Sequence, residues 1–261
     1  MRSHKPSFRF ALTCISQILV LRDRVLGWTG PGRQPIPGLS SRQITIPSGN
    51  NQLDAVFVEP TDAPARAALL LCHGIGETVE HWFPVQRLLA ENGVASLLFD
   101  YSGYGRSTGH PDWDQYDLDA LSAFETLKRL TAPLPNAILG FSLGTGPACS
   151  IVNTAAPDHL ILCAAFTSFR DAAHAGGVAP ALLPLVPPIW SASESLRNCQ
   201  TPILIVHGEK DSLFPVQMAH DLVALCPGPV ELLVMPNYAH NQPFRKPRVD
   251  YWGPIIARLT A

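Results

Sequence analysis

Two stretches of this sequence place a serine between two glycines, an arrangement that can present a hydroxyl group as a nucleophile. Residues 140–144 are Gly-Phe-Ser-Leu-Gly, and residues 105–109 are Gly-Arg-Ser-Thr-Gly. Such a serine works when a strand runs into a sharp turn and a helix follows at once. Ser142 meets this condition, because an apolar segment precedes it and small residues follow it. Ser107 lies in a polar, glycine-rich loop, so we predict that Ser142 is the nucleophile.

A serine hydroxyl is a weak nucleophile, so it needs a base, and the base needs a carboxylate that orients it. Three histidines follow the late apolar runs. His240 lies directly after the last run and is the predicted base. His207, at a strand end, is interpreted as a packed histidine, and His220 as a surface residue of a helix. Asp211 is the predicted orienting acid, although a helix cap is its alternative role. Asp171 is a lower-ranked substitute.

Acyl transfer also needs N–H donors for the negative oxygen that develops on the attacked carbonyl group. The main-chain N–H of Leu143, directly after the serine, is the first predicted donor. The second should come from a loop after an early strand, and His-Gly-Ile-Gly at 73–76 follows the apolar run 67–72. We predict that Ile75 supplies this N–H and that His73 is a structural residue of the loop.

The elements that would position these residues alternate between short apolar runs and helix-like stretches. Such alternation predicts a mostly parallel central sheet with helices on both faces. Ligands of such sheets bind beyond the carboxyl ends of the strands, where the predicted site residues lie. The predicted strands are 42–47 and 53–58, joined as a hairpin, then 67–72, 94–99, 136–141, 160–165, 202–206 and 230–234, and the helical stretches are 79–92, 116–130, 143–155, 215–225 and 242–259.

One interval is longer than a normal crossover connection. Residues 166–200 separate two predicted strands, and residues 176–190 within them carry four prolines and no charge. Long apolar insertions in compact domains are usually lids or binding loops. We therefore predict a short lid insertion with apolar side chains that line a substrate pocket, namely Leu182, Leu185, Ile189 and Trp190.

The first 40 residues differ from the rest and are predicted to be a basic and apolar extension of one α/β domain over 41–261. Residues 1–33 hold six basic side chains and one acidic one, and the remaining chain holds 13 basic and 20 acidic ones. The apolar run 10–21 is shorter than the roughly 20 residues that cross a membrane. Arg-Asp-Arg follows it where an export signal has small residues. Three interpretations stay open: a docked helix, a peripheral membrane contact of residues 1–33, and an atypical export signal.

Composition excludes several classes of protein. The 261 residues are 46% hydrophobic and 15% charged, with 25 prolines and a net charge of -2. These values exclude an intrinsically disordered chain and a coiled coil, and they do not favour a nucleic-acid partner. The six cysteines show no C-x-x-C spacing, which favours a reducing compartment and therefore a cytoplasmic location. No cluster with metal-ligand spacing occurs, so neither a metal nor a cofactor is predicted.

The sequence resembles the α/β-hydrolase superfamily, and within it the compact serine hydrolases of the serine aminopeptidase and lysophospholipase-like group with a small lid. The resemblance rests on segments 71–74, 99–107, 140–144, 202–211 and 238–240, which occur in the family's order within residues 42–260. It implies an α/β-hydrolase fold in which the loop of Asp100 and Ser107 is structural. The sequence departs from the family at Ser102, where arginine is more common, and the first 40 residues lie outside the match.

The resemblance implies hydrolysis of a carboxylic ester or thioester through an acyl-enzyme, with such a small molecule as the binding partner. A serine at position 142 excludes haloalkane dehalogenases and epoxide hydrolases, which need a carboxylate there. No charged residue lies between Asp171 and Glu194, so an anchor for the ammonium group of a peptide is not evident and an apolar acyl group is preferred. The alternatives are an acyltransferase on the same triad, a peptidase and a non-catalytic binding protein. The oligomeric state is left open.

Overall fold

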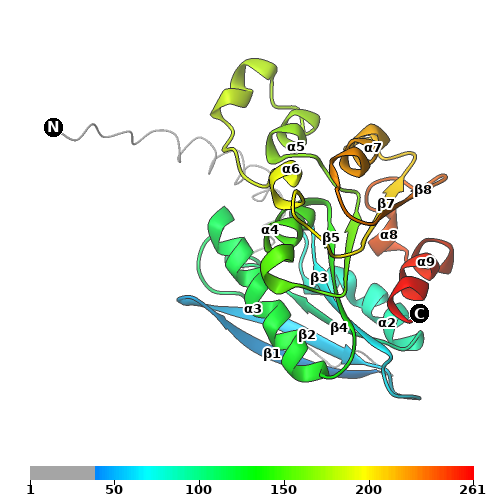
Figure 1. Cartoon of the computed structure of the whole chain (residues 1–261). Coiled ribbons are helices and arrows are strands. Elements are labelled where there is room, and N and C mark those ends of the chain that lie inside the picture. Colours follow the sequence, from blue (N-terminus) through cyan, green and yellow to red (C-terminus); the bar gives the residue numbers. More distant parts are fainter. Residues whose placement is uncertain (1–38) are drawn as a thin grey trace.

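A computed structural model describes residues 39–261, and eight strands in this part of the chain form one sheet (Figure 1). The membrane contact predicted for residues 1–33, and nearly all of the predicted 1–40 extension, lie outside the described residues. The strand order is β1-β2-β4-β3-β5-β6-β7-β8. The first two pairings, β1 with β2 and β2 with β4, are antiparallel, and the others are parallel. The strands are β1 (Ser40–Ser48), β2 (Asn51–Glu59), β3 (Ala67–Cys72), β4 (Val94–Phe99), β5 (Asn136–Phe141), β6 (His159–Cys163), β7 (Ile203–Gly208) and β8 (Val230–Met235).

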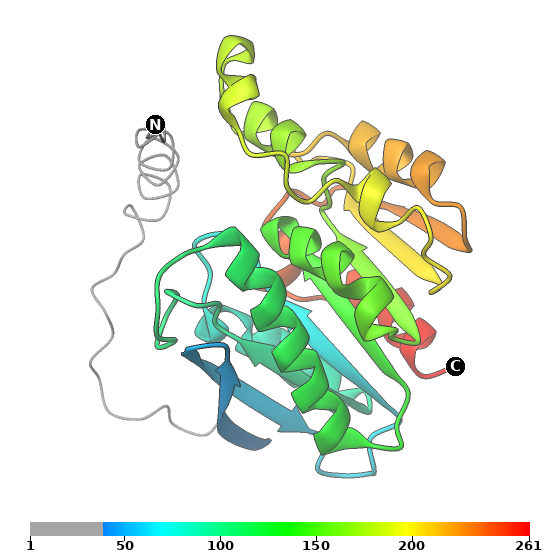
Figure 2. The same ribbon diagram turned by 60° about the vertical axis from the view of Figure 1, so that its left-hand side comes forward.

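Helices cover both faces of the sheet, as the predicted α/β fold requires (Figure 2). Two apolar cores result, and side chains of one strand alternate between them. In β3, Leu70 packs into the core beneath α3 (Trp113–Thr131) and α4 (Thr145–Ala155), together with α7 (Val216–Leu225). Leu69 and Leu71 pack into the opposite core, beneath α2 (Phe83–Glu91) and α9 (Val249–Leu259). Burial on both faces explains why the strand sequences are continuous apolar runs.

Three predicted helical stretches are divided in the structure, and one of them, 143–155, begins within the 3-10 helix η2 (Ser142–Gly144) before α4. The stretch 242–259 forms α8 (Gln242–Arg245) and α9, with Pro247 between them. The residue before a proline disfavours the helical conformation, and proline itself lacks the N–H that a helix interior needs. The stretch 79–92 forms the 3-10 helix η1 (Val79–Trp82) followed by α2. Proline near the first turn of α2 is compatible with a helix start at this point.

The long interval between β6 and β7 projects from the body of the molecule (Figure 2). It contains α5 (Phe169–Ala175), the 3-10 helix η3 (Pro180–Leu185) and α6 (Ala192–Ser195). This lid therefore has little regular structure. Within residues 39–261 no helix combines the length and the apolarity that a membrane crossing requires. The five cysteines in the same range are free thiols.

A buried carboxylate connects the β1–β2 hairpin, the loop after β4 and α3. Asp119 accepts hydrogen bonds from the hydroxyl of Ser48, from the N–H and hydroxyl of Ser102, and from the side-chain amide of Gln115, at 2.7–3.0 Å. Ser102 is fully buried. The departure from the family at this position is therefore accommodated by a hydrogen-bond network around Asp119.

We expect the Asp119→Ala variant to be strongly destabilised, because four hydrogen bonds lose their acceptor and buried donors stay unpaired. The free energy of unfolding should fall by about 3 kcal/mol, measured by urea denaturation. The matched control is Glu125→Ala on the exposed face of the same helix, with an expected change within about 0.5 kcal/mol. Equal losses in the two variants would contradict the structural role of the network.

Candidate active site

The chain turns sharply where β5 ends, and Ser142 lies at the turn. Its φ of 52° is in the left-handed region that a non-glycine residue seldom adopts. The 3-10 helix η2 (Ser142–Gly144) and then α4 follow directly. A Cβ atom at Gly144 would lie 2.0 Å from the carbonyl oxygen of Cys72, so only glycine fits there. The sequence around Ser142 thus forms the strand–turn–helix arrangement that presents a serine above the sheet.

Ser142, His240 and Asp211 form one continuous chain of hydrogen bonds. His240 Nε2 lies 2.9 Å from Ser142 Oγ, and His240 Nδ1 lies 2.7 Å from Asp211 Oδ2. The three side chains come from the loops after β5, β8 and β7, respectively. The structure therefore brings together the three residues that the sequence predicts as nucleophile, base and acid.

The surroundings of Asp211 keep its carboxyl group ionised. Burial raises the pKa of Asp211. The opposite effect is larger: the hydrogen bond and charge of His240, together with the N–H donors of Phe214 and Leu213, lower the pKa below its usual value. An ionised Asp211 accepts the Nδ1–H of His240. Nε2 is then free to accept the hydroxyl proton of Ser142, which is the protonation state that a general base requires.

Three residues with no predicted catalytic role do not belong to this hydrogen-bond chain, namely His207, His220 and Ser107. His207 is fully buried, and its Nε2 lies 2.9 Å from the carbonyl oxygen of Phe214. Burial lowers the pKa of His207, which favours the neutral ring, although the same nitrogen lies 3.7 Å from Asp211 Oδ2. His220 is exposed on α7. The hydroxyl of Ser107 donates to the carbonyl of Asp100 and accepts the N–H of Asp54.

Asp171, the lower-ranked acid, lies in the first turn of α5. Its carboxylate accepts from the hydroxyls of Thr167 and Ser168 at 2.5 and 2.6 Å. No bond of Asp171 to His240 accompanies these contacts, so Asp211 and not Asp171 is the carboxylate bonded to the predicted base. Within the described residues, no three His, Cys, Asp or Glu side chains gather as metal ligands would.

The loop after β3 lies against the turn at Ser142, since Gly144 packs on its first carbonyl groups. His73 is buried, and its Nδ1 lies 2.8 Å from the carbonyl oxygen of Gly74. Burial lowers the pKa of His73 to about 4, so the ring is neutral, as expected of a structural residue. The N–H groups of Ile75 and Leu143 stay the predicted oxyanion donors.

Glu77, which is buried beside this loop, is not among the residues predicted from the sequence. Its Oε2 accepts the N–H of Gly74 at 2.9 Å and the indole N–H of Trp82 at 2.8 Å. The sequence carries no distinctive signal for this role, because Thr78, Glu80 and His81 make the segment after Glu77 as polar as Glu77 itself.

The four predicted lid residues have different surroundings. Leu182 and Leu185 on η3 are about half exposed, at 48% and 46%, whereas Trp190 is only 7% exposed. Ile189 is half-buried against the core. The indole N–H of Trp190 donates to Asp117 on α3 at 2.8 Å. Trp190 therefore packs at the base of the lid, the two leucines are exposed to solvent, and the role of all four in substrate binding stays a prediction.

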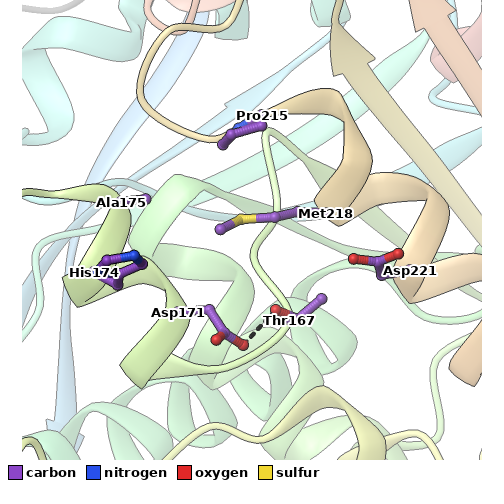
Figure 3. Close-up of a pocket in the computed structure, with 7 residues that line it drawn as sticks. All are labelled: Thr167, Asp171, His174, Ala175, Pro215, Met218 and Asp221. Carbon is purple, nitrogen blue, oxygen red and sulfur yellow. Dashed lines mark hydrogen bonds between the residues drawn. The ribbon is translucent and has the colours of Figure 1, made fainter. Parts of the chain in front are cut away.

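A hollow of ≈ 450 Å³ lies between α5 and α7, beside the base of the lid (Figure 3). Two of its lining residues directly follow Phe166 and Phe214, whose rings contact each other. Phe214 also contacts the ring of His240, with centroids 5.2 Å apart. Phe214 thus links the wall of the hollow to the ring of His240. Its lining residues are Thr167, Asp171, His174, Ala175, Pro215, Met218 and Asp221.

Fold and site together define an α/β-hydrolase. Residues 63–194 match the family model described as serine aminopeptidase, S33, and this match covers half of the chain. The chain therefore belongs to this family of α/β-hydrolases.

Among curated proteins, the chain is similar to lysophosphatidylserine lipase ABHD12 of Macaca fascicularis. The two are 31% identical over 192 residues, which cover 66% of this chain and 48% of that protein. The chain thus spans about half the length of that relative. It is also similar to the uncharacterized protein Rv2307c of Mycobacterium tuberculosis, at 28% identity over 224 residues, 82% of this chain and 79% of that one.

Two solved structures share the fold. The esterase Pf2001 of Pyrococcus furiosus has a TM-score of 0.72 and 18% identity, with coverage of 88% of this chain and 97% of that one. An alpha-beta hydrolase from Vibrio vulnificus has a TM-score of 0.76 and 20% identity, with coverage of 98% and 95%. At these identities the likeness concerns the fold alone.

We expect Gly144→Ala to destabilise the protein, because the added methyl group meets main-chain atoms that must shift. The free energy of unfolding should fall by about 2–4 kcal/mol, measured by thermal and urea denaturation. Gly253→Ala on α9 is the control. A Cβ there meets only Val249 at 3.6 Å, and alanine in a helix interior should raise stability by up to ~1 kcal/mol. Equal free energies of unfolding in the two variants would contradict the conclusion that main-chain packing limits position 144 to glycine.

Proposed function

We propose that this protein is a serine hydrolase that cleaves a carboxylic ester or thioester with an apolar acyl group through an acyl-enzyme. The observation that carries the proposal is the hydrogen-bond chain from Ser142 through His240 to Asp211, with distances of 2.9 and 2.7 Å. The left-handed turn at Ser142 supports it, because backbone strain of this kind is common at catalytic sites.

In the proposed reaction, Ser142 Oγ attacks the carbonyl carbon of the substrate while His240 Nε2 takes the hydroxyl proton. The N–H groups of Leu143 and Ile75 stabilise the negative oxygen of the tetrahedral intermediate. When the intermediate collapses, the leaving alcohol or thiol takes the proton from His240 and the acyl group stays on Ser142. Water then attacks the acyl-enzyme with His240 again as base, and the acid product and free Ser142 result.

The preference for an apolar acyl group rests on the lid and on the relatives. Residues 176–190 carry no charge. The half-buried rings of Trp113 and Phe169 lie beside the buried Trp190, with centroids 5.4 and 5.5 Å from its ring. The name of the curated relative, a lysophosphatidylserine lipase, points to an ester substrate as well.

The hollow between α5 and α7 favours one second candidate, a peptidase or aminoacyl esterase. Asp171 and Asp221 line the hollow, and carboxylates are the groups that an ammonium ion prefers. The family description, serine aminopeptidase, agrees with such a substrate. The two carboxylates thus support the peptidase alternative, which the uncharged lid sequence disfavours.

We expect Ser142→Ala to abolish ester turnover and labelling by a fluorophosphonate probe, because the attacking oxygen is lost. The kcat should fall by about 10⁴-fold or more, measured with a chromogenic ester. Ser107→Ala, which removes the other Gly-x-Ser-x-Gly hydroxyl, is the matched control and should keep the labelling. Undiminished turnover in Ser142→Ala would refute the assignment, and a failure of the folded wild type to label would favour a non-catalytic binding protein.

Among esters of increasing chain length, we expect kcat/KM to rise beyond acetyl, because each buried methylene contributes about 0.8 kcal/mol. A panel of p-nitrophenyl esters from acetyl to dodecanoyl measures this, and aminoacyl p-nitroanilides test the peptidase alternative. A sharp acetyl optimum would contradict the apolar acyl site. Product analysis with added alcohols and thiols separates hydrolysis from acyl transfer.

A further inference from the structure

Glu77 is a buried carboxyl group next to the loop that carries a predicted oxyanion donor. The side chain is 8% exposed. A single oxygen atom, Oε2, accepts both the N–H of Gly74 and the indole N–H of Trp82. These two donors belong to the loop after β3 and to η1, so the carboxylate connects two segments on the same side of the turn at Ser142.

The carboxyl group also lies flat against Gly74. A Cβ atom at Gly74 would lie 2.8 Å from Glu77 Oε1 and 3.1 Å from the carboxyl carbon. The loop thus approaches Glu77 more closely than a residue with a side chain could. Because Ile75 follows Gly74 directly, the direction of the Ile75 N–H depends on how Gly74 is held.

The second donor, Trp82, extends this contact toward the base. Its ring stacks on Phe244 at 5.2 Å and meets the edge of Phe141 at 5.4 Å. Phe141 precedes the predicted nucleophile and contacts the ring of His240 at 5.5 Å. Glu77 therefore contacts both the loop after β3 and an aromatic group that packs on Phe141, the residue before Ser142.

The charge on Glu77 is sensitive to pH near neutrality. Burial raises the pKa of Glu77 to about 7, although Trp82, the Gly74 N–H and the positive charge of Arg245 on α8 act in the opposite direction. The pKa of Tyr104, in the loop after β4, is raised to about 12 by burial. Tyr104 is therefore uncharged near pH 7, as is His73. On the segment of Glu77 itself, Glu80 and His81 bond to Thr78.

We propose that the ionised carboxylate of Glu77 is a positioning residue that holds the 73–76 loop so that the Ile75 N–H points at the oxyanion. Hydrogen bonds to an ionised acceptor are roughly twice as strong as neutral ones, so ionisation of Glu77 strengthens the hydrogen bond that it accepts from the Gly74 N–H. Oxyanion donors act in the transition state and only when they are already in place. This inference rests on the proposed function and adds a pH-dependent control of the same site.

The decisive variant is Glu77→Gln, which keeps an acceptor oxygen and the size of the side chain but removes the charge. We expect kcat to fall about 10- to 100-fold while KM changes less than about threefold, since a transition-state contact is weakened. Glu80→Gln is the matched control, because it removes an exposed carboxylate three residues along the chain. It should retain wild-type values.

The pH profile gives a readout that loss of packing would not produce. In the wild type, ionisation of Glu77 should contribute a rise of kcat/KM around pH 7, and this rise should disappear in Glu77→Gln. In Trp82→Phe the rise should move to higher pH, because the indole N–H that favours the ionised form is lost.

As pH rises through this range, the stability of the wild type should fall while its activity rises. The pKa of Glu77 is raised in the folded state, so the folded protein binds more protons than the unfolded chain between about pH 4.5 and pH 7. The wild type therefore loses stability as pH rises through this window, and Glu77→Gln does not. The Tm of Glu77→Gln minus that of the wild type should grow from pH 5 to pH 8, although kcat is lower.

The outcomes separate the inference from the proposed function. If the wild type labels and Ser142→Ala does not, while Glu77→Gln keeps wild-type kcat and pH profile, only the role of Glu77 is overturned. A Glu77→Gln variant whose Tm differs from that of the wild type by the same amount at every pH would also overturn it, in favour of a carboxyl group that does not titrate in this window. Undiminished turnover in Ser142→Ala overturns both.

Discussion

The structure depends on one tight turn, in which the chain passes from β5 into α4 at Ser142. The backbone there adopts a left-handed conformation that costs on the order of 1–3 kcal/mol. It is held because Gly140 packs on the carbonyl of Gly144, and Gly144 packs on the carbonyls of Cys72 and His73. The same contacts that force the turn thus bring the loop after β3 against it, so the nucleophile and the predicted oxyanion loop are positioned by one constraint.

The remaining site residues follow from strand order. The sheet places β3 beside β5, and β7 beside β8, and all four are parallel, so their carboxyl ends lie along one edge. His240 follows β8, extends back over Phe141 and bridges Ser142 with Asp211. If His240 acts as the proposed base, its ring plane must be fixed. The rings of Phe141 and Phe214, which contact His240 at 5.5 and 5.2 Å, hold it in place.

How far the sequence predicts this arrangement depends on the range of the interactions. The strands β3, β4 and β5 have the predicted bounds, because burial on both faces leaves continuous apolar runs. The apolar pattern continues across Pro247, but the helix does not, because the residue before a proline disfavours the helical conformation. The role of Glu77 was not predictable, since it depends on the indole of Trp82 and on the close approach of Gly74. Neither contact leaves a periodic pattern.

Trp190 shows how the lid is tied to the catalytic turn. Its backbone is left-handed, and its indole binds Asp117, which also accepts the hydroxyl of Ser150 on α4. A Cβ at Gly146 would lie 2.4 Å from the indole ring, so the ring rests on the first turn of α4, which follows η2 and Ser142. Movement of Trp190 would therefore disturb α4, whereas Leu182 and Leu185 are about half exposed to solvent. Selectivity for the acyl group should consequently be determined at the base of the lid, where geometry is fixed, and not at its exposed tip.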